Sequence, residues 1–219
     1  LMNVLECFSG THSVGKVCDS LGWCSISVDN ELPATHREDI MTFNYKQYPK
    51  DYFDIVWCSP PCIAYSNLQN SWIGRHKKGG LYTKEQMNKD MDDSDKLVLK
   101  SLEIISYFRP KLWFLENPMT GRLKDRSIMD GLPFYDVSYC KYSDWGYQKH
   151  TRIWTNKKGW TPLYCKYDCS NLISIETKTK SRNTIQKKHT SNLGKVGGGS
   201  NRLDRYRVPH KLISSLFLD

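Results

Sequence analysis

Residues Asp54–Ser66 read DIVWCSPPCIAYS. The apolar run that follows Asp54 is short and rich in β-formers, which is typical of a buried parallel strand. Pro60 and Pro61 end this strand, because proline cannot donate a hydrogen bond to a sheet and two in succession stiffen the chain. Cys62 is therefore expected on a rigid turn at the carboxyl end of a strand, where open α/β sheets bind their ligands.

Short apolar segments and helical patterns alternate on both sides of this stretch. Strands are expected at residues 2–7, 25–28, 54–57, 112–115, 135–140 and 152–154, and helices at 8–16, at 96–108 and from Arg207 onward. Residues 67–94 are expected to form a long polar loop, either a functional lid or a disordered segment. The alternation predicts an α/β fold with a Rossmann-like, doubly wound and mostly parallel sheet, followed by a small basic, loop-rich C-terminal region.

The positive charge of the chain is concentrated in its last third. The 219 residues carry a net charge of +9. Residues 155–219 hold 13 Lys and Arg against 4 Asp and Glu, whereas the first 154 residues hold 19 of each sign. A solvated tail would explain this excess, and a surface that contacts phosphates is the alternative interpretation.

The length is that of one domain with a small appendage. The 8 cysteines are scattered, without the density of a secreted disulfide scaffold. No apolar run approaches a membrane span, and the first residues lack the pattern of a signal peptide. We therefore expect a soluble, intracellular monomer that does not associate with membranes.

Four short motifs occur in a fixed order. Phe8-Ser9-Gly10 lies in the first strand-to-helix turn, Pro61-Cys62 and Glu116-Asn117 each follow a predicted strand, and Gln148-x-His150-x-Arg152 leads into the last one. Together they resemble the DNA cytosine-5 methyltransferase family over roughly residues 2–155. Val208-Pro209 resembles the last motif of that family.

The resemblance implies the S-adenosylmethionine-dependent methyltransferase fold and a reaction on a cytosine flipped out of double-stranded DNA. Cys62 would add to carbon 6 of the ring, so that carbon 5 can take the methyl group of S-adenosylmethionine. Glu116 would protonate ring nitrogen 3, and Arg152, with Gln148 and His150 of the same motif, would fix the ring oxygen and support the thiolate. Without the resemblance, Cys62 would be read as a small buried hydrophobe, Glu116 as a loop carboxylate and Arg152 as a surface cation.

The same resemblance implies a set of residues that contact the cofactor. Asp29 is also a candidate by position, since an acidic residue after the second strand can bind a ribose, and Glu31 is the alternative. The full set is Phe8, Ser9, Gly10, Thr11, Asp29, Asn30, Asp39, Ile40, Pro60 and Val208.

We expect three regions: a cofactor-binding catalytic domain at 1–154, a short target-recognition region at 155–202, and a C-terminal helix at 203–219 that packs back on the catalytic domain. The 67–94 loop would close over DNA, with its glycines as hinges and its cations on phosphates. The candidate DNA-binding residues are Ser66, Arg75, Lys77, Lys78, Lys187, Lys188 and Arg202.

Cys165-x3-Cys169 together with His189 suggests zinc, but the spacing is loose and the sequence offers no obvious fourth ligand. Two cysteines that steady a loop are the simpler interpretation, so no metal is predicted.

Three positions depart from the family pattern. Ile63 replaces a glutamine, His150 replaces the first arginine of its motif, and Arg205-Tyr206-Arg207 stands where the family has Gly-Asn-Ala. The last change leaves open a modified S-adenosylmethionine with an anionic group.

Other functions remain as alternatives. Ser59-Pro60-Pro61 also resembles the Ser-Pro-Pro-aromatic motif of amino-group methyltransferases. The aromatic residue of that motif stands at the position that Cys62 occupies in this chain. RNA cytosine-5 methylation and a non-catalytic nucleic-acid-binding relative are the further alternatives.

Overall fold

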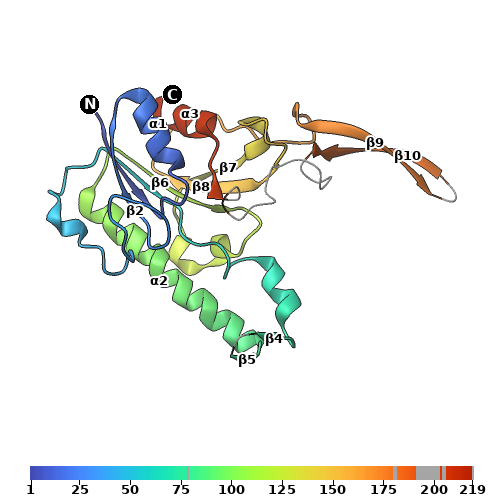
Figure 1. Cartoon of the computed structure of the whole chain (residues 1–219), viewed down its shortest axis with the longest axis horizontal. Helices are drawn as coiled ribbons and strands as arrows, with labels where there is room; N and C mark the ends of the chain where they lie inside the picture. Colours follow the sequence, from blue (N-terminus) through green and yellow to red (C-terminus); the bar gives the residue numbers. More distant parts are fainter. Residues whose placement is uncertain (78, 180–181, 191–202, 204–205, 219) are drawn as a thin grey trace.

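The computed structural model describes residues 1–77, 79–179, 182–190, 203 and 206–218 (Figure 1). Two of the candidate DNA-binding residues, Lys78 and Arg202, lie outside this described part, as does Arg205.

A six-stranded sheet forms the centre of the molecule, with the strand order β2-β1-β3-β6-β8-β7. Its strands are β1 (Asn3–Cys7), β2 (Cys24–Val28), β3 (Ile55–Cys58), β6 (Leu112–Pro118), β7 (Phe134–Ser138) and β8 (His150–Thr155). The pairs β1–β2, β1–β3 and β3–β6 are parallel, while β8 runs antiparallel to both β6 and β7. The predicted mostly parallel sheet is therefore confirmed.

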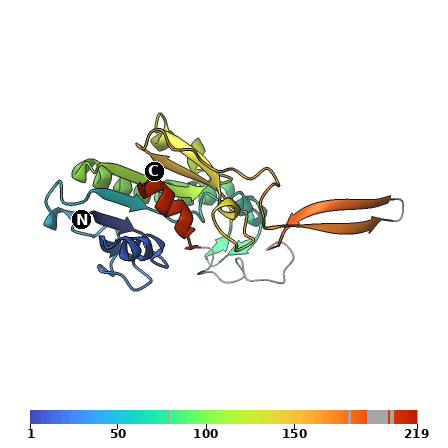
Figure 2. The same cartoon turned by 90° about the horizontal axis from the view of Figure 1, so that it is seen from above.

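Helices cover both faces of this sheet (Figures 1 and 2). The long helix α2 (Lys84–Phe108) packs on one face, and α1 (Ser13–Leu21) and α3 (His210–Leu218) pack together on the other. The sequence permits this because successive side chains of a strand point to opposite faces. In β3, for example, Val56 faces α2 while Ile55 and Trp57 face α1 and α3, and all three are at most 1% exposed.

The expected 67–94 loop is wrong in its second half. Asn67–Trp72 forms a 3-10 helix, a small hairpin pairs β4 (His76–Lys77) with β5 (Gly80–Leu81), and α2 already begins at Lys84. The Thr83 hydroxyl caps α2 by accepting a hydrogen bond from the Gln86 backbone N–H at 3.2 Å. Met87 and Met91 are buried one turn apart, so the apolar stripe of the helix extends through this polar sequence.

The C-terminal region contains an element that was not predicted. β9 (Leu172–Thr179) and β10 (Arg182–His189) form an antiparallel hairpin that projects away from the body (Figures 1 and 2). Ile173 and Ile185 of this hairpin are 38% and 72% exposed, so it packs little apolar surface on the sheet. The remaining short helices are 3-10 turns at Tyr45–Gln47, Leu123–Asp125, Ser127–Met129 and Tyr139–Lys141.

None of the helices in the described part of the chain is both long enough and apolar enough to cross a lipid bilayer.

Candidate active site

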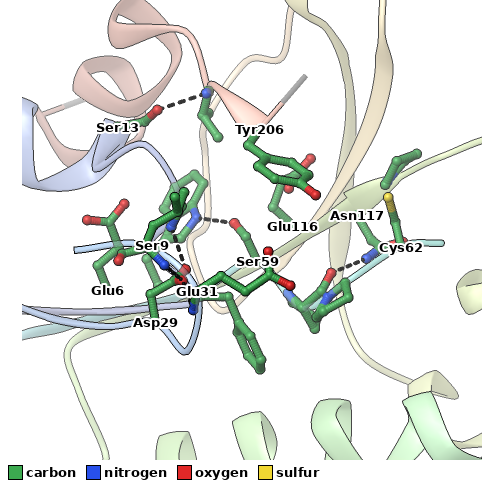
Figure 3. Close-up of a pocket in the computed structure, with 18 of the residues that line it drawn as sticks. Glu6, Ser9, Ser13, Asp29, Glu31, Ser59, Cys62, Glu116, Asn117 and Tyr206 are labelled. Carbon is green, nitrogen blue, oxygen red and sulfur yellow. Dashed lines mark hydrogen bonds between the residues drawn. The ribbon is translucent and has the colours of Figure 1, made fainter. Parts of the chain in front are cut away.

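A pocket opens at the carboxyl ends of the parallel strands β1, β2, β3 and β6 (Figure 3). The segment before α3 closes one side of it through Tyr206 and Val208. Nine residues predicted from the sequence line this pocket: Phe8, Ser9, Gly10, Asp29, Asn30, Pro60, Cys62, Glu116 and Val208. The candidate cofactor turn and the candidate nucleophile thus share one cavity.

The turn after β1 is held in a left-handed conformation. Phe8 and Gly10 have φ angles of 58° and 50°. Glycine suits such a position because it has no Cβ to clash. The Gly10 backbone N–H donates to Asp29 Oδ2 at 2.8 Å, and Asp29 Oδ1 accepts from the backbone N–H groups of Glu31 and Leu32. Asp29 therefore braces two loops of the pocket with both of its oxygens.

Ser9 presents a hydroxyl that no other described residue satisfies. The residue is 5% exposed, and its Oγ is buried without a hydrogen-bond partner in the described part of the chain. A buried hydroxyl of this kind costs free energy unless a ligand or water bonds to it. Because Ser9 lines the pocket beside Gly10, the donor set at this end fits a polar ligand.

Glu6 is a functional residue that the sequence reasoning missed. It is 3% exposed within the buried strand β1, and its carboxylate accepts from the backbone N–H groups of Val14 and Gly15, both at 3.0 Å. These are free donors of the first turn of α1, so the carboxylate caps the helix from outside and fixes the turn between them. The sequence signal for Glu6 was an acidic residue within the otherwise apolar end of a predicted strand.

Two side-chain hydrogen bonds fix the turn that carries Cys62. Trp57 Nε1 donates to Ser59 Oγ at 2.9 Å, and Asn117 Nδ2 donates to the Pro60 carbonyl oxygen at 3.0 Å. The second bond ties the end of β6 to the end of β3, so Cys62 and Glu116 are held at the same edge of the sheet. Asn117 Oδ1, also buried, has no partner among the described residues.

Glu116 lies in a buried polar cluster. Its Oε1 accepts from Tyr139 Oη at 3.0 Å and from Lys149 Nζ at 3.2 Å. The side chains of Lys149 and Glu116 are only 12% and 7% exposed. Lys149 also lines the pocket, although the sequence reasoning had not selected it.

The charges of this cluster act on Cys62. Burial raises the pKa of the Cys62 thiol, and the carboxylate of Glu116 adds to this effect, whereas the ammonium of Lys149 opposes it. Burial alone would lower the pKa of Lys149, but Glu116 and Cys62 outweigh it and raise that pKa. The thiol is therefore protonated at neutral pH, and Lys149 is the neighbouring charge that favours its ionisation.

Arg152, which the sequence predicts to act on the reacting base, does not line the pocket. Its guanidinium pairs with both carboxylate oxygens of Asp136 at 2.8 Å and lies 3.6 Å over the ring of Phe134. Because side chains alternate along a strand, Arg152 points away from the face that carries Lys149 and Glu116.

The other two members of that motif also lie outside the pocket lining. His150 Nδ1 forms a hydrogen bond with Ser138 Oγ at 2.8 Å. The imidazole ring also stacks on the ring of Tyr164, with the two ring centroids 4.6 Å apart. Gln148 is half-buried in the segment before β8.

Three predicted cofactor residues do not line the pocket: Thr11, Asp39 and Ile40. The hydroxyl oxygen of Thr11 lies 3.4 Å from the hydroxyl oxygen of Ser13, within hydrogen-bond distance. Asp39 Oδ1 accepts from the Met41 backbone N–H at 2.8 Å, and Ile40 is 4% exposed in the core beneath α2. Asp39 therefore stabilises a turn, and Ile40 packs in the hydrophobic core.

The segment before α3 closes the pocket from the C-terminal side. The Val208 backbone N–H donates to Ser13 Oγ at 3.0 Å, which ties this segment to the start of α1. Tyr206 lines the pocket together with Glu116 (Figure 3). The guanidinium of Arg207 lies 4.3 Å over the ring of Trp145.

The described candidate DNA-binding residues lie in two places. Arg75 is exposed near Trp72, while Lys77 donates to Gln69 Oε1 at 2.8 Å and lies 3.4 Å over the ring of Tyr82. Lys187 and Lys188 belong to β10 of the projecting hairpin. Ser66 accepts a bond from the Leu68 backbone N–H and begins the 3-10 helix after the Cys62 turn.

The chain is similar over nearly its whole length to a curated viral protein. A protein of Frog virus 3 (isolate Goorha) named "Probable DNA (cytosine-5)-methyltransferase" is 39% identical over 220 residues, which cover 98% of each chain. No family model matches the sequence.

The fold is shared with a solved structure. The methyltransferase EhMeth of Entamoeba histolytica superposes with a TM-score of 0.51 at 16% identity, covering 75% of this chain and 57% of that one. The Dnmt2 methyltransferase of S. pombe gives a TM-score of 0.46 at 14% identity, covering 74% and 54%. The chain thus spans little more than half the length of these two structures.

Proposed function

The chain belongs to the DNA (cytosine-5)-methyltransferase family, and from this we propose that it transfers a methyl group from S-adenosylmethionine to carbon 5 of cytosine in double-stranded DNA. The observation that supports the proposal most directly is a single pocket that holds Cys62 and Glu116 at one end and the Ser9-Gly10 turn at the other.

We assign the nucleophile to Cys62. Carbon 5 of cytosine is a poor nucleophile, and it becomes enamine-like when a thiolate adds to carbon 6. The new bond between sulfur and carbon 6 pushes electrons toward ring nitrogen 3, which must then take a proton or a hydrogen bond. After methyl transfer, nitrogen 3 returns its proton to Glu116, and loss of the carbon 5 proton to solvent expels the cysteine as a thiolate and restores the ring. The thiolate then regains a proton, so Cys62 is unchanged at the end.

Glu116 is the group we assign to ring nitrogen 3. Its Oε1 is held by Tyr139 and Lys149, so the carboxyl group is fixed in orientation while Oε2 takes no part in these two bonds. A carboxyl group fixed beside the base can act as a general acid on nitrogen 3 once it has received a proton, and the Cys62 thiol is the proton source in this pocket. Tyr139 is fully buried and acts as a positioning residue.

Lys149 takes the electrophilic role in place of Arg152. A cation beside the thiol and the carboxylate stabilises negative charge as it develops on sulfur and on the ring. Since burial leaves the Cys62 thiol protonated in the free protein, its proton has to leave as the base binds. We assign this proton to the carboxylate of Glu116, and Lys149 lowers the cost of forming the thiolate.

The other end of the pocket fits S-adenosylmethionine, whose sulfonium makes the bound methyl group electrophilic. The unsatisfied hydroxyl of Ser9 and the backbone of Gly10 offer polar contacts. Asp29 accepts three backbone hydrogen bonds and braces the pocket wall. Glu31 also lines the pocket, and we assign the ribose hydroxyls to it (Figure 3).

We propose that the region 155–202 contacts DNA and that the described β9–β10 hairpin is part of this surface. Lys187 and Lys188 lie on the hairpin, and its projection from the body would let it reach along a duplex (Figure 2). Lysines on such a surface bind phosphates, which gives affinity without reading sequence.

The test is methyl transfer to unmodified double-stranded DNA, followed by digestion to nucleosides and mass spectrometry. We expect 5-methylcytosine from the unmodified chain and none from Cys62→Ala. Cys24→Ser is the matched control, because Cys24 is exposed and lies outside the pocket. N-methylated bases that survive Cys62→Ala would refute the cysteine mechanism, and product on RNA alone would refute the assignment to DNA.

A further inference from the structure

Four potential metal ligands meet at a place distinct from the pocket. They are Cys140, Cys165, Cys169 and His189, and their ligand atoms all lie within 4.8 Å of one another. The sequence pattern had suggested only Cys165, Cys169 and His189 as possible ligands. Cys140 belongs to the 3-10 turn after β7, so it is the tertiary structure that supplies the fourth ligand.

The distances match those of a tetrahedral ion with sulfur and nitrogen ligands. His189 Nε2 lies 3.6 Å from Cys165 Sγ and 3.4 Å from Cys169 Sγ. Zinc bonds of about 2.3 Å to sulfur and about 2.0 Å to nitrogen place the ligand atoms of a tetrahedral site about 3.6 to 3.8 Å apart. Since the largest separation is 4.8 Å, the thiols need to move by no more than about 1 Å to close on one ion.

His189 lacks ordinary hydrogen-bond partners. It is fully buried, its Nδ1 has no partner in the described part of the chain, and Nε2 faces sulfur atoms. Burying an imidazole this way is costly, and a cation bound to Nε2 would compensate for it.

The local backbone is shaped around these sulfur atoms. Tyr167 adopts a left-handed φ of 60°, which turns the chain back between Cys165 and Cys169. The Cys165 backbone N–H donates to Ser138 Oγ at 2.9 Å, and Asn171 Nδ2 donates to the Cys140 carbonyl oxygen at 2.8 Å, so the ligand-bearing segments are already linked.

We propose that Cys140, Cys165, Cys169 and His189 bind one Zn²⁺ ion as a structural Cys3His site. Four protein ligands leave no open position for substrate, and three thiolates with one imidazole suit zinc better than calcium or magnesium. All eight cysteines are free of disulfides, so the three thiols are available.

The ion would fasten the hairpin to the body. His189 is the last residue of β10, whereas Cys140 follows β7 of the central sheet. If His189 and Cys140 bind the same ion, the base of the hairpin is fixed to the central sheet. The hairpin itself packs little apolar surface on the body, so this link would matter for its position. The site is independent of the proposed methyl transfer, since none of its ligands lines the pocket.

The first measurement is the zinc content of the full chain, purified without chelators, by elemental mass spectrometry. We expect one zinc per chain, and less than a tenth of that in Cys140→Ser and in Cys169→Ser. Cys24→Ser, at an exposed cysteine outside the cluster, is the matched control and should keep its zinc. Cys169 is only half-buried, so its variant is expected to fold even if Cys140→Ser does not.

Replacement of the metal by Co²⁺ gives a second readout that does not depend on activity. Tetrahedral thiolate ligation predicts strong visible absorption and a sulfur-to-cobalt charge-transfer band, which should weaken in each Cys→Ser variant of the cluster. Chelation of the unmodified chain should speed proteolysis within residues 172–189. The proposal is overturned if the reduced full chain holds neither zinc nor cobalt, if both cluster variants keep full metal content, or if two of these cysteines form a disulfide.

Discussion

Replacing Lys149 by methionine should abolish most of the methyl transfer, whereas replacing Arg152 should not. Methionine keeps an unbranched side chain of nearly the same length but removes the ammonium next to Glu116 and Cys62. The two cations are three residues apart, and the family motif favours Arg152, while the structure places Lys149 in the pocket.

The magnitude follows from burial and distance. Lys149 Nζ lies 3.2 Å from Glu116 Oε1, and at an effective dielectric constant of about 20 this corresponds to about 5 kcal/mol of attraction. Leaving a buried carboxylate without its partner costs about 3 kcal/mol or more in stability. Loss of one preorganised charge at the reacting atoms lowers the rate by about 100-fold.

Arg152 sits in a less buried ion pair. Its side chain and that of Asp136 are 16% and 27% exposed, so Arg152→Met should cost about 1 kcal/mol of stability. We expect its rate of methyl transfer to stay within about twofold of the unmodified chain, because its side chain lies on the other face of β8.

The assay is single-turnover methyl transfer on saturating DNA, with urea denaturation of each variant run alongside. Lys149→Arg separates charge from shape, and we expect it to recover part of the rate. The reasoning is refuted if Arg152→Met loses about 100-fold while folded and Lys149→Met remains active.

Three further predictions follow from individual residues. Because burial raises the pKa of Cys62, its thiolate fraction is small at neutral pH, and its alkylation rate, followed by peptide mass spectrometry, should rise about tenfold per pH unit from about pH 7 to 9; a flat profile would contradict the assignment. Ser9→Ala should weaken S-adenosylmethionine binding about fivefold in calorimetry without lowering stability, since the hydroxyl has no partner among the described residues; equal affinity would remove Ser9 from the site. Asp95→Ala should lower the free energy of unfolding in urea by about 3 kcal/mol, because the buried carboxylate accepts from Tyr65 Oη at 2.8 Å and from Arg126 Nε at 2.9 Å; a loss below about 1 kcal/mol would show that this network does not matter.

The sequence by itself determined the sheet and the two residues at its edge. β3 is apolar over its length and is followed by Ser59 and two prolines, so its position follows from local chemistry. The strand expected at 112–115 continues in β6 to Pro118, because Glu116, Asn117 and Pro118 pair with β8. Since the carboxyl ends of parallel strands meet at one edge, Cys62 and Glu116 were expected close together, and both line the pocket.

Local patterns were less informative where a segment packs through a few residues. Residues 84–94 are mostly polar, and their helix depends on the Thr83 cap and on Met87 and Met91 finding buried positions against the body. The β9–β10 hairpin has its own pairing but leaves Ile173 and Ile185 exposed, so its strands lack the one-sided burial that makes a strand recognisable.

Only the tertiary structure decided which cation faces the reacting groups and which cysteine completes the metal cluster. Side chains alternate along a strand, so Lys149 or Arg152 enters the pocket according to how β8 pairs with β6, and a shift of one residue would exchange the two faces. Cys140 joins Cys165, Cys169 and His189 because β7 and β10 end at the same place in space. Both results depend on contacts between distant segments, which no spacing along the chain specifies.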